Sequence, residues 1–426
     1  MNETTLMSRR HLLCCGVGMA MGLFTGLAAA NGEGIEQAPQ GLASSSLRDL
    51  VHAAFDGIEA GALWDAHAHL LGTGDAGSGC RVHPAMQQWW HPQDWLRRRV
   101  ILDAAGVAAD APSIDEAYVA RLLHLAADFP AGARWLLFAF EEALDDAGRP
   151  RDEWTTFHVP NEYAARVAAA HPQRFAWVAS IHPYRDDAVE RLDAAASTGA
   201  LAVKWLPSAM NIDPRDARCR PFYDRLAKLG LPLIVHCGEE KAVPGAHREA
   251  FGNPLLMRVP LEQGVRVVVA HAASLGSALD TDRPGAPKVA AFDLFARLMD
   301  EPAWRDRLLA DVSAVAQINR PARVLRTLVR RDDWHARLLH GSDHPLPGVK
   351  LLVSPARLAA ADLLDDADVQ PLERLRERSP LLFDLALKRR LRDSRGARFA
   401  PNVFETRRHF ERPAATLRRD PPGAPA

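Results

Sequence analysis

Two histidines that stand two residues apart give the first sign of chemistry in this sequence. They lie in the segment Trp64-Asp65-Ala66-His67-Ala68-His69-Leu70, which we predict to be a β-strand. Alternate residues of a strand point to the same side, so Asp65, His67 and His69 should share one face. Two imidazoles arranged in this way can bind one metal ion from the same side.

Further polar residues lie within or at the ends of other apolar runs. Imidazole and carboxylate groups are ligands that suit zinc and similar divalent ions. A single histidine at a strand end is more often a hydrogen-bonded core residue, and Asp343 could merely cap a turn. Taken together, however, the pattern predicts a divalent metal site. The additional candidates are Lys204, His236, His271 and Asp343.

Eight short apolar runs alternate with amphipathic segments from residue 61 onward. Most runs are apolar throughout, as strands covered on both faces must be. Eight such β-then-α units predict a parallel (β/α)8 barrel, or TIM barrel, with its active site at the C-terminal ends of the strands. The predicted strands are residues 63–70, 135–140, 175–182, 201–206, 232–237, 265–271, 308–315 and 337–340.

The connection after the first predicted strand is long and should form an insertion over the site. It contains a glycine-rich loop, residues 72–79, and two predicted helices, 92–105 and 113–127. The loop lacks the spacing and the lysine of a phosphate-binding loop, so we interpret it as a flexible lid. Helices should follow the eighth strand to about residue 395.

The N-terminus has the features of an export signal. Arg9 and Arg10 precede a weakly apolar run that ends in Ala28-Ala29-Ala30, which predicts a cleaved twin-arginine signal peptide over residues 1–30. The expected partner is the twin-arginine export machinery and the expected location is the periplasm. An uncleaved signal that anchors the protein in the inner membrane is the alternative.

The remaining domain boundaries follow from composition. Residues 31–60 read as a linker with a short helix from about 46 to 59, residues 61–400 as the barrel with its C-terminal helices, and residues 401–426 as a disordered tail. The formal net charge of the 426 residues is -1, which offers no electrostatic case for nucleic-acid binding. The sequence leaves a homo-oligomer open.

Three cysteines would remain after signal cleavage. Cys80, Cys219 and Cys237 allow at most one internal disulfide, so the protein is not a disulfide scaffold. Cys237 follows His236 at the end of an apolar run, and we interpret it as a packed thiol.

The ordered set of polar residues resembles the amidohydrolase superfamily of metal-dependent hydrolases, from about residue 64 to residue 345. That family carries HxH on strand 1, Lys or Glu on strand 4, His on strands 5 and 6, and Asp on strand 8. The motif Gly341-Ser342-Asp343-His344-Pro345 looks most like the amidohydrolase-2 branch, which contains hydrolases and decarboxylases. The resemblance implies the metal ligands His67, His69, Lys204, His236, His271 and Asp343.

Such a site would make hydroxide available at neutral pH, because a divalent ion lowers the pKa of bound water toward about 7. Asp343 would carry the proton to the leaving group, and His271 could help to polarise a carbonyl. This predicts hydrolysis of an amide, ester or lactone bond in a small-molecule substrate. The alternatives are a non-oxidative decarboxylase of the same superfamily and a non-catalytic metal-binding or ligand-binding module.

The details of the metal site stay open at this stage. Zinc is the favoured ion, with manganese and iron as alternatives, and one or two ions could bind. Lys204 could be carboxylated to bridge two ions, as in the family, or could contact the substrate. Arg185 and Arg320 follow the third and seventh predicted strands, and either could hold a substrate carboxylate.

Overall fold

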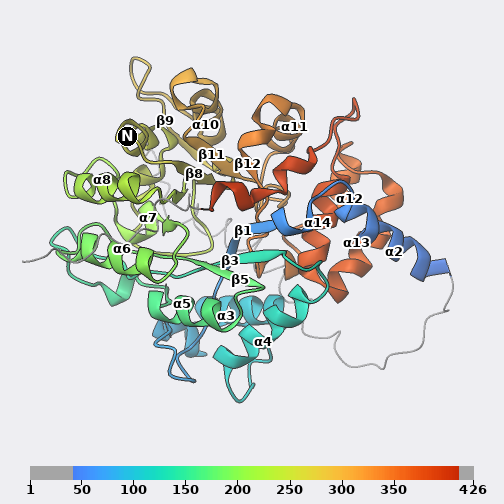
Figure 1. Cartoon of the computed structure of the whole chain (residues 1–426), viewed down its shortest axis with the longest axis horizontal. Helices are drawn as coiled ribbons and strands as arrows, with labels where there is room; N and C mark the ends of the chain where they lie inside the picture. Colours follow the sequence, from blue (N-terminus) through green and yellow to red (C-terminus); the bar gives the residue numbers. More distant parts are fainter. Residues whose placement is uncertain (1–41, 412–426) are drawn as a thin grey trace, which may run out of the picture. The chain divides into compact units, whose positions relative to one another are not determined.

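The computed structural model describes residues 42–411 (Figure 1). The chain divides into two units, residues 1–46 and residues 47–426. The predicted signal peptide and residues 31–41 of the predicted linker lie outside the described residues. Helix α2 spans Leu42–Phe55, so it begins and ends four residues before the predicted helix 46–59.

The second unit contains eight parallel strands, one in each predicted apolar run. Several end before the predicted boundary because the polar residues at their C-terminal ends leave the sheet and enter loops. The strands are β1 (Trp64–His69), β3 (Arg134–Phe138), β5 (Phe175–Val178), β6 (Val203–Trp205), β7 (Leu233–His236), β8 (Val267–Ala270), β11 (Leu308–Asp311) and β12 (Leu338–Leu339).

The strands follow one another in chain order around a ring. Two sheets, β1-β3-β5 and β6-β7-β8-β11-β12, are linked by parallel bridges between Ala179 and Val203 and between Ala68 and His344. Buried apolar side chains from all around the ring, among them Phe138, Ile234 and Val268, pack together in its interior. The predicted (β/α)8 barrel is therefore confirmed.

Helices cover the outside of the strands (Figure 1). A second and larger apolar cluster lies between the helices and the outer faces of the strands. The helices after the insertion are α5 (Asn161–Ala170), α6 (Ala188–Ser197), α7 (Pro207–Met210), α8 (Cys219–Leu229), α9 (Arg258–Glu262), α10 (Ala291–Asp300), α11 (Ala322–Arg330), α12 (Pro355–Ala360), α13 (Asp366–Arg378) and α14 (Pro380–Arg390).

Strand β1 does not alternate regularly along its length. Its pairing with β3 shifts register between Asp65 and Ala68, which is the mark of a β-bulge. Asp65 pairs with the outward-facing Trp135, whereas the ring of His67 lies 4.6 Å from the inward-facing Phe138. The prediction that Asp65 shares a face with the two histidines is wrong, because the bulge turns both imidazoles to the barrel interior.

The insertion after β1 contains both predicted helices, α3 (Pro92–Ala105) and α4 (Ile114–Ala126). Asp75 of the glycine-rich loop accepts hydrogen bonds from the first turn of α4. Asp115 of that turn accepts three hydrogen bonds from the loop backbone. The loop is thus fastened to α4 at both sides, which does not support a flexible lid.

Two short antiparallel pairs were not predicted. They are β2 (Arg81–Val82) with β4 (Phe157–His158), and β9 (Ser277–Leu279) with β10 (Lys288–Ala290). Each strand has only two or three residues, too few for a period of two to show in the sequence.

The predicted disordered tail begins too early. Residues 401–411 form two short 3-10 helices, Pro401–Val403 and Thr406–His409. Phe410 is 1% exposed and belongs to the apolar cluster inside the barrel. An aromatic anchor therefore holds this segment in place despite its polar composition, and residues 412–426 lie outside the described part.

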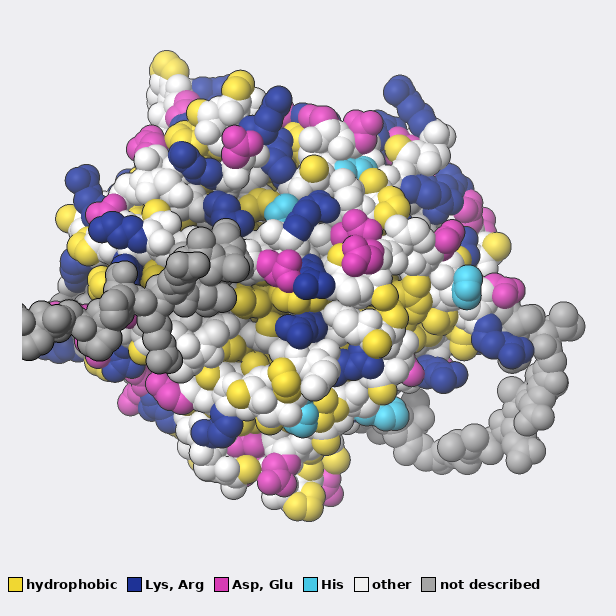
Figure 2. All heavy atoms as spheres, in the orientation of Figure 1, with side chains coloured by type: hydrophobic (Ala, Val, Ile, Leu, Met, Phe, Trp, Pro, Cys, Tyr) yellow, Lys and Arg dark blue, Asp and Glu magenta, His cyan; other side chains and the backbone are white. Residues whose placement is uncertain are grey.

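Three further observations concern the charge of the surface, the cysteines and the hydrophobicity of the helices. On the face drawn in Figure 2, the basic and acidic side chains of the described residues are interspersed. Cys80, Cys219 and Cys237 are buried free thiols, which confirms the interpretation of Cys237 as a packed thiol. Burial raises the pKa of the Cys237 thiol to about 12. Within residues 42–411, no helix is both long and apolar enough to cross a membrane.

Candidate metal centre

One carboxylate oxygen faces two imidazoles at the C-terminal end of the barrel. Asp343 Oδ1 lies 3.1 Å from His69 Nε2 and 3.6 Å from His67 Nε2. His67 Nε2 is buried and has no hydrogen-bond partner among the described residues. A buried nitrogen of this kind is expected to have a partner that is not part of the chain, and a metal ion suits this donor set.

Asp311, at the end of β11, fixes the ring of His67. Its Oδ2 lies 2.9 Å from His67 Nδ1, on the opposite side of the ring from Asp343. Its Oδ1 accepts hydrogen bonds from the backbone N–H groups of His271 and Ser313, both at 3.0 Å. Metal-binding histidines commonly have such a carboxylate on the second ring nitrogen, which sets the tautomer and the direction of the first.

Sequence reasoning missed Asp311. The available signal was a carboxylate inside an otherwise apolar run, Leu308-Leu309-Ala310-Asp311-Val312. A charge is rarely buried without a partner, so its position predicts a functional or ion-paired role.

His271 and His236 line the same end of the barrel. The ring of His271 stacks 4.8 Å from that of His67, and its Nδ1 lies 2.7 Å from Ser313 Oγ. His67, His271 and Asp311 form a second group whose ligand atoms lie within 4.8 Å of one another. His236 lies 5.2 Å from His271 by ring centroids, and its Nδ1 is 3.2 Å from Glu240 Oε2.

Lys204 is buried at the same level of the barrel. Its side chain is 2% exposed, and Nζ lies 5.2 Å from the ring of Phe138, which also contacts the rings of His67 and His69. Burial lowers the pKa of Lys204, although nearby carboxylates oppose this shift. A lower pKa makes the neutral amine more accessible, and the neutral amine is the form that reacts with carbon dioxide.

The electrostatics of the cluster suit a bound cation. Burial lowers the pKa of His67 to about 4, so the imidazole is neutral at neutral pH, as a metal ligand must be. Burial alone would raise the pKa of Asp343, but His271, His69 and His67 together hold it below its usual range. The site therefore offers a neutral imidazole at His67 and an ionised carboxylate at Asp343, both in the form that binds a cation.

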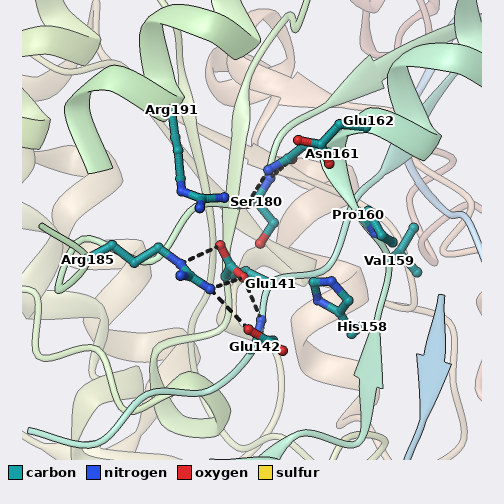
Figure 3. A pocket seen from close by; sticks show the side chains of 10 residues that line it. All are labelled: Glu141, Glu142, His158, Val159, Pro160, Asn161, Glu162, Ser180, Arg185 and Arg191. Carbon is teal, nitrogen blue, oxygen red and sulfur yellow. Dashed lines mark hydrogen bonds and ion pairs between the residues drawn. The ribbon is translucent and has the colours of Figure 1, made fainter. Parts of the chain in front are cut away.

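The two arginines considered from the sequence have different surroundings. Arg185 lines a cavity of about 310 Å³ at the C-terminal ends of β3 and β5, where it pairs with Glu141 and Glu142 at 3.1 and 3.0 Å (Figure 3). Arg320 forms no ion pair with any carboxylate of residues 42–411. Its Nη1 donates to Ser274 Oγ, and its buried Nε has no partner.

Comparisons with known proteins extend these observations. A family model described as "Amidohydrolase" matches residues 64–378, a range that contains every predicted ligand. No curated protein sequence matches the chain.

Solved structures show remote similarity. An uncharacterised TIM-barrel protein from Bordetella bronchiseptica is 17% identical, with 75% of this chain and 99% of that chain covered and a TM-score of 0.45. A probable 2-pyrone-4,6-dicarboxylic acid hydrolase from Acinetobacter baumannii is 13% identical (76% and 95% covered, TM-score 0.39). A 5-carboxyvanillate decarboxylase from Sphingomonas paucimobilis is 12% identical (82% and 98% covered, TM-score 0.41).

We expect the double variant His67→Ala with His69→Ala to lose bound metal while the barrel stays folded, because two of the three converging ligand atoms are removed. Elemental analysis of the purified protein, alongside its circular dichroism spectrum, measures both effects. The control is His335→Ala, which removes a buried histidine whose Nε2 instead contacts the Leu328 carbonyl at 3.1 Å. Unchanged metal content in the double variant would show that the ion binds elsewhere.

Proposed function

The chain belongs to the amidohydrolase family, whose members are metal-dependent enzymes, and we propose that it hydrolyses an amide, ester or lactone bond of a small molecule. The observation that carries this proposal is the convergence of His67 Nε2, His69 Nε2 and Asp343 Oδ1, with His67 Nε2 buried and unpartnered. We propose zinc as the ion, with manganese and iron as alternatives.

His67, His69 and Asp343 would hold the ion, with His271, His236 and Lys204 around it. When bound, a divalent ion supplies a Lewis acid and lowers the pKa of a coordinated water toward about 7. Asp343 accepts a proton at its carboxylate and passes it to the leaving group. His271, held through Nδ1 by Ser313, presents its other ring edge to the substrate carbonyl.

A decarboxylase is the second candidate, and Arg320 is the observation that favours it. A decarboxylase must hold a substrate carboxylate, and Arg320 is a partly buried cation whose charge no carboxylate of the described residues neutralises through an ion pair. Guanidinium groups bind carboxylates with two parallel hydrogen bonds. A screen of the metal-loaded protein on amides, lactones and aromatic acids separates the two reactions. Hydrolysis of an amide gives a carboxylic acid and an amine, hydrolysis of a lactone gives a hydroxy acid, and decarboxylation releases carbon dioxide.

We expect Asp343→Asn to keep most of the bound metal and to lose about 10²–10⁴-fold in turnover, the usual contribution of a positioned proton carrier. Asparagine keeps the size and one ligand oxygen of aspartate but cannot accept the proton. Turnover and metal content are measured on the same sample. Asp393→Asn, which changes a fully buried carboxylate that pairs with Arg330, is the control and should leave turnover unchanged. Turnover of Asp343→Asn within a few-fold of wild type would remove Asp343 from the mechanism.

We expect Arg320→Met to raise KM for a carboxylate-bearing substrate by about 10- to 100-fold, because one charge-assisted contact is worth about 1.5–3 kcal/mol. The KM for an uncharged analogue of the same substrate should change little. Arg185→Met is the matched control, since its guanidinium is already neutralised by Glu141 and Glu142. Equal effects of Arg320→Met on charged and uncharged substrates would contradict a carboxylate-binding role.

We also propose export to the periplasm by the twin-arginine route, which carries folded proteins and would allow metal to be loaded beforehand. The support is the sequence of residues 1–30 alone. Arg9→Lys with Arg10→Lys should retain the protein inside the cell, as measured by fractionation. Arg407→Lys with Arg408→Lys, an adjacent pair elsewhere in the chain, should not. Undiminished periplasmic recovery of the first variant would overturn the proposal.

A further inference from the structure

The loop that carries Asp343 has an unfavourable backbone conformation. Asp343 has φ of 61°, a value that L-residues with a side chain rarely adopt. Gly341, two residues earlier, lies so close to β1 that an added Cβ would come within 2.7 Å of the His67 Cβ. A loop of this kind persists only where its surroundings fix it.

One peptide group of this loop is held from both of its polar ends. The carbonyl of Gly341 accepts a hydrogen bond from Lys388 Nζ at 2.6 Å. The N–H of Ser342, which belongs to the same peptide group, donates to Asp65 Oδ1 at 2.8 Å. Both side chains are buried, with residue exposures of 1% for Lys388 and 4% for Asp65.

Each of these side chains is itself fixed. Lys388 lies on α14 and also donates to Asp384 Oδ2, one turn earlier on that helix, at 2.6 Å. Asp65 Oδ1 also accepts the backbone N–H of His67 at 3.0 Å. Asp65 therefore accepts hydrogen bonds from the backbone of both segments that carry converging ligands. One donor is the N–H of His67 itself, and the other is the N–H of Ser342, the residue before Asp343.

We propose that Lys388 and Asp65 clamp the Gly341–Ser342 peptide and so set the position of Asp343 relative to His67. Both are positioning residues, because neither reaches the converging ligand atoms. The inference rests on the proposed function in one respect, that the ligand cluster binds a metal ion. Its alternative is that the same bonds only stabilise the fold.

Metal affinity separates positioning from stability. Loss of a group that orients a metal ligand usually weakens metal binding about 10- to 100-fold. We expect Asp65→Leu and Lys388→Met each to bind zinc that much more weakly, measured on metal-free protein by competition with a chromophoric chelator. Asp65→Asn should stay within about threefold of wild type, since its amide oxygen can accept both N–H groups.

The chain offers a matched control for the buried lysine. Arg376 on α13 is 4% exposed, pairs with Glu373 and donates to a backbone carbonyl, that of Val353, at 2.6 Å. That carbonyl belongs to a segment without predicted ligands. Arg376→Met should lower the melting temperature but leave the zinc affinity unchanged.

The outcomes distinguish the clamp from the proposed function. Failure of the wild-type protein to bind zinc or another divalent ion would overturn the proposed function. Zinc affinity of both Asp65→Leu and Lys388→Met within threefold of wild type, with melting temperatures lowered as in Arg376→Met, would overturn the clamp. If Lys388→Met does not fold, Lys388→Met with Asp384→Leu leaves no unpaired buried charge and tests the same bond.

Discussion

The structure depends on the contact between the first and last strands of the barrel. Three backbone hydrogen bonds close the ring there. The N–H of Ala66 donates to the His340 carbonyl at 2.9 Å, that of Asp343 to the His67 carbonyl at 2.7 Å, and that of His69 to the His344 carbonyl at 3.0 Å. The last two bonds involve residues that also supply the candidate ligands. The same contact that closes the ring therefore brings the candidate ligands His67, His69 and Asp343 together.

This arrangement places charged groups where water cannot reach them. Asp311 and Asp343 are both almost fully buried, and a buried carboxylate is costly unless it is paired. Contacts with imidazole nitrogens offset part of that cost, since Asp311 Oδ2 lies 2.9 Å from His67 Nδ1 and Asp343 Oδ1 lies 3.1 Å from His69 Nε2. A bound cation would add to the same balance, because the cluster has two carboxylates and burial keeps His67 neutral. Below this layer the barrel interior is apolar, so the charges are confined to the end where the strands finish.

The sequence was sufficient for the parts of the fold that depend on local patterns. The eight strands, the two helices of the insertion and the candidate ligands all follow from apolar runs and from polar residues at their ends. The bulge in β1 could not be predicted, because it results from register against β3, about seventy residues later. The burial of Lys388 could not be predicted either, because the basic run Lys388-Arg389-Arg390-Leu391-Arg392 is typical of the solvated face of a C-terminal helix. Only the packing of α14 behind the Asp343 loop buries it.

Arg185 and Arg320 show why residue type and strand position alone do not decide a role. Both follow a barrel strand at the catalytic end, and the sequence treats them alike. Arg185 forms ion pairs with Glu141 and Glu142, so carboxylates in the wall of the cavity already neutralise its charge (Figure 3). Arg320 meets only a hydroxyl, and its buried Nε is left without a partner. A partly buried cation in that state attracts an anion more strongly than an ion-paired one does, because binding breaks no existing ion pair. Of these two arginines, Arg320 is therefore the one whose guanidinium forms no ion pair among the described residues, and it follows β11 in the chain.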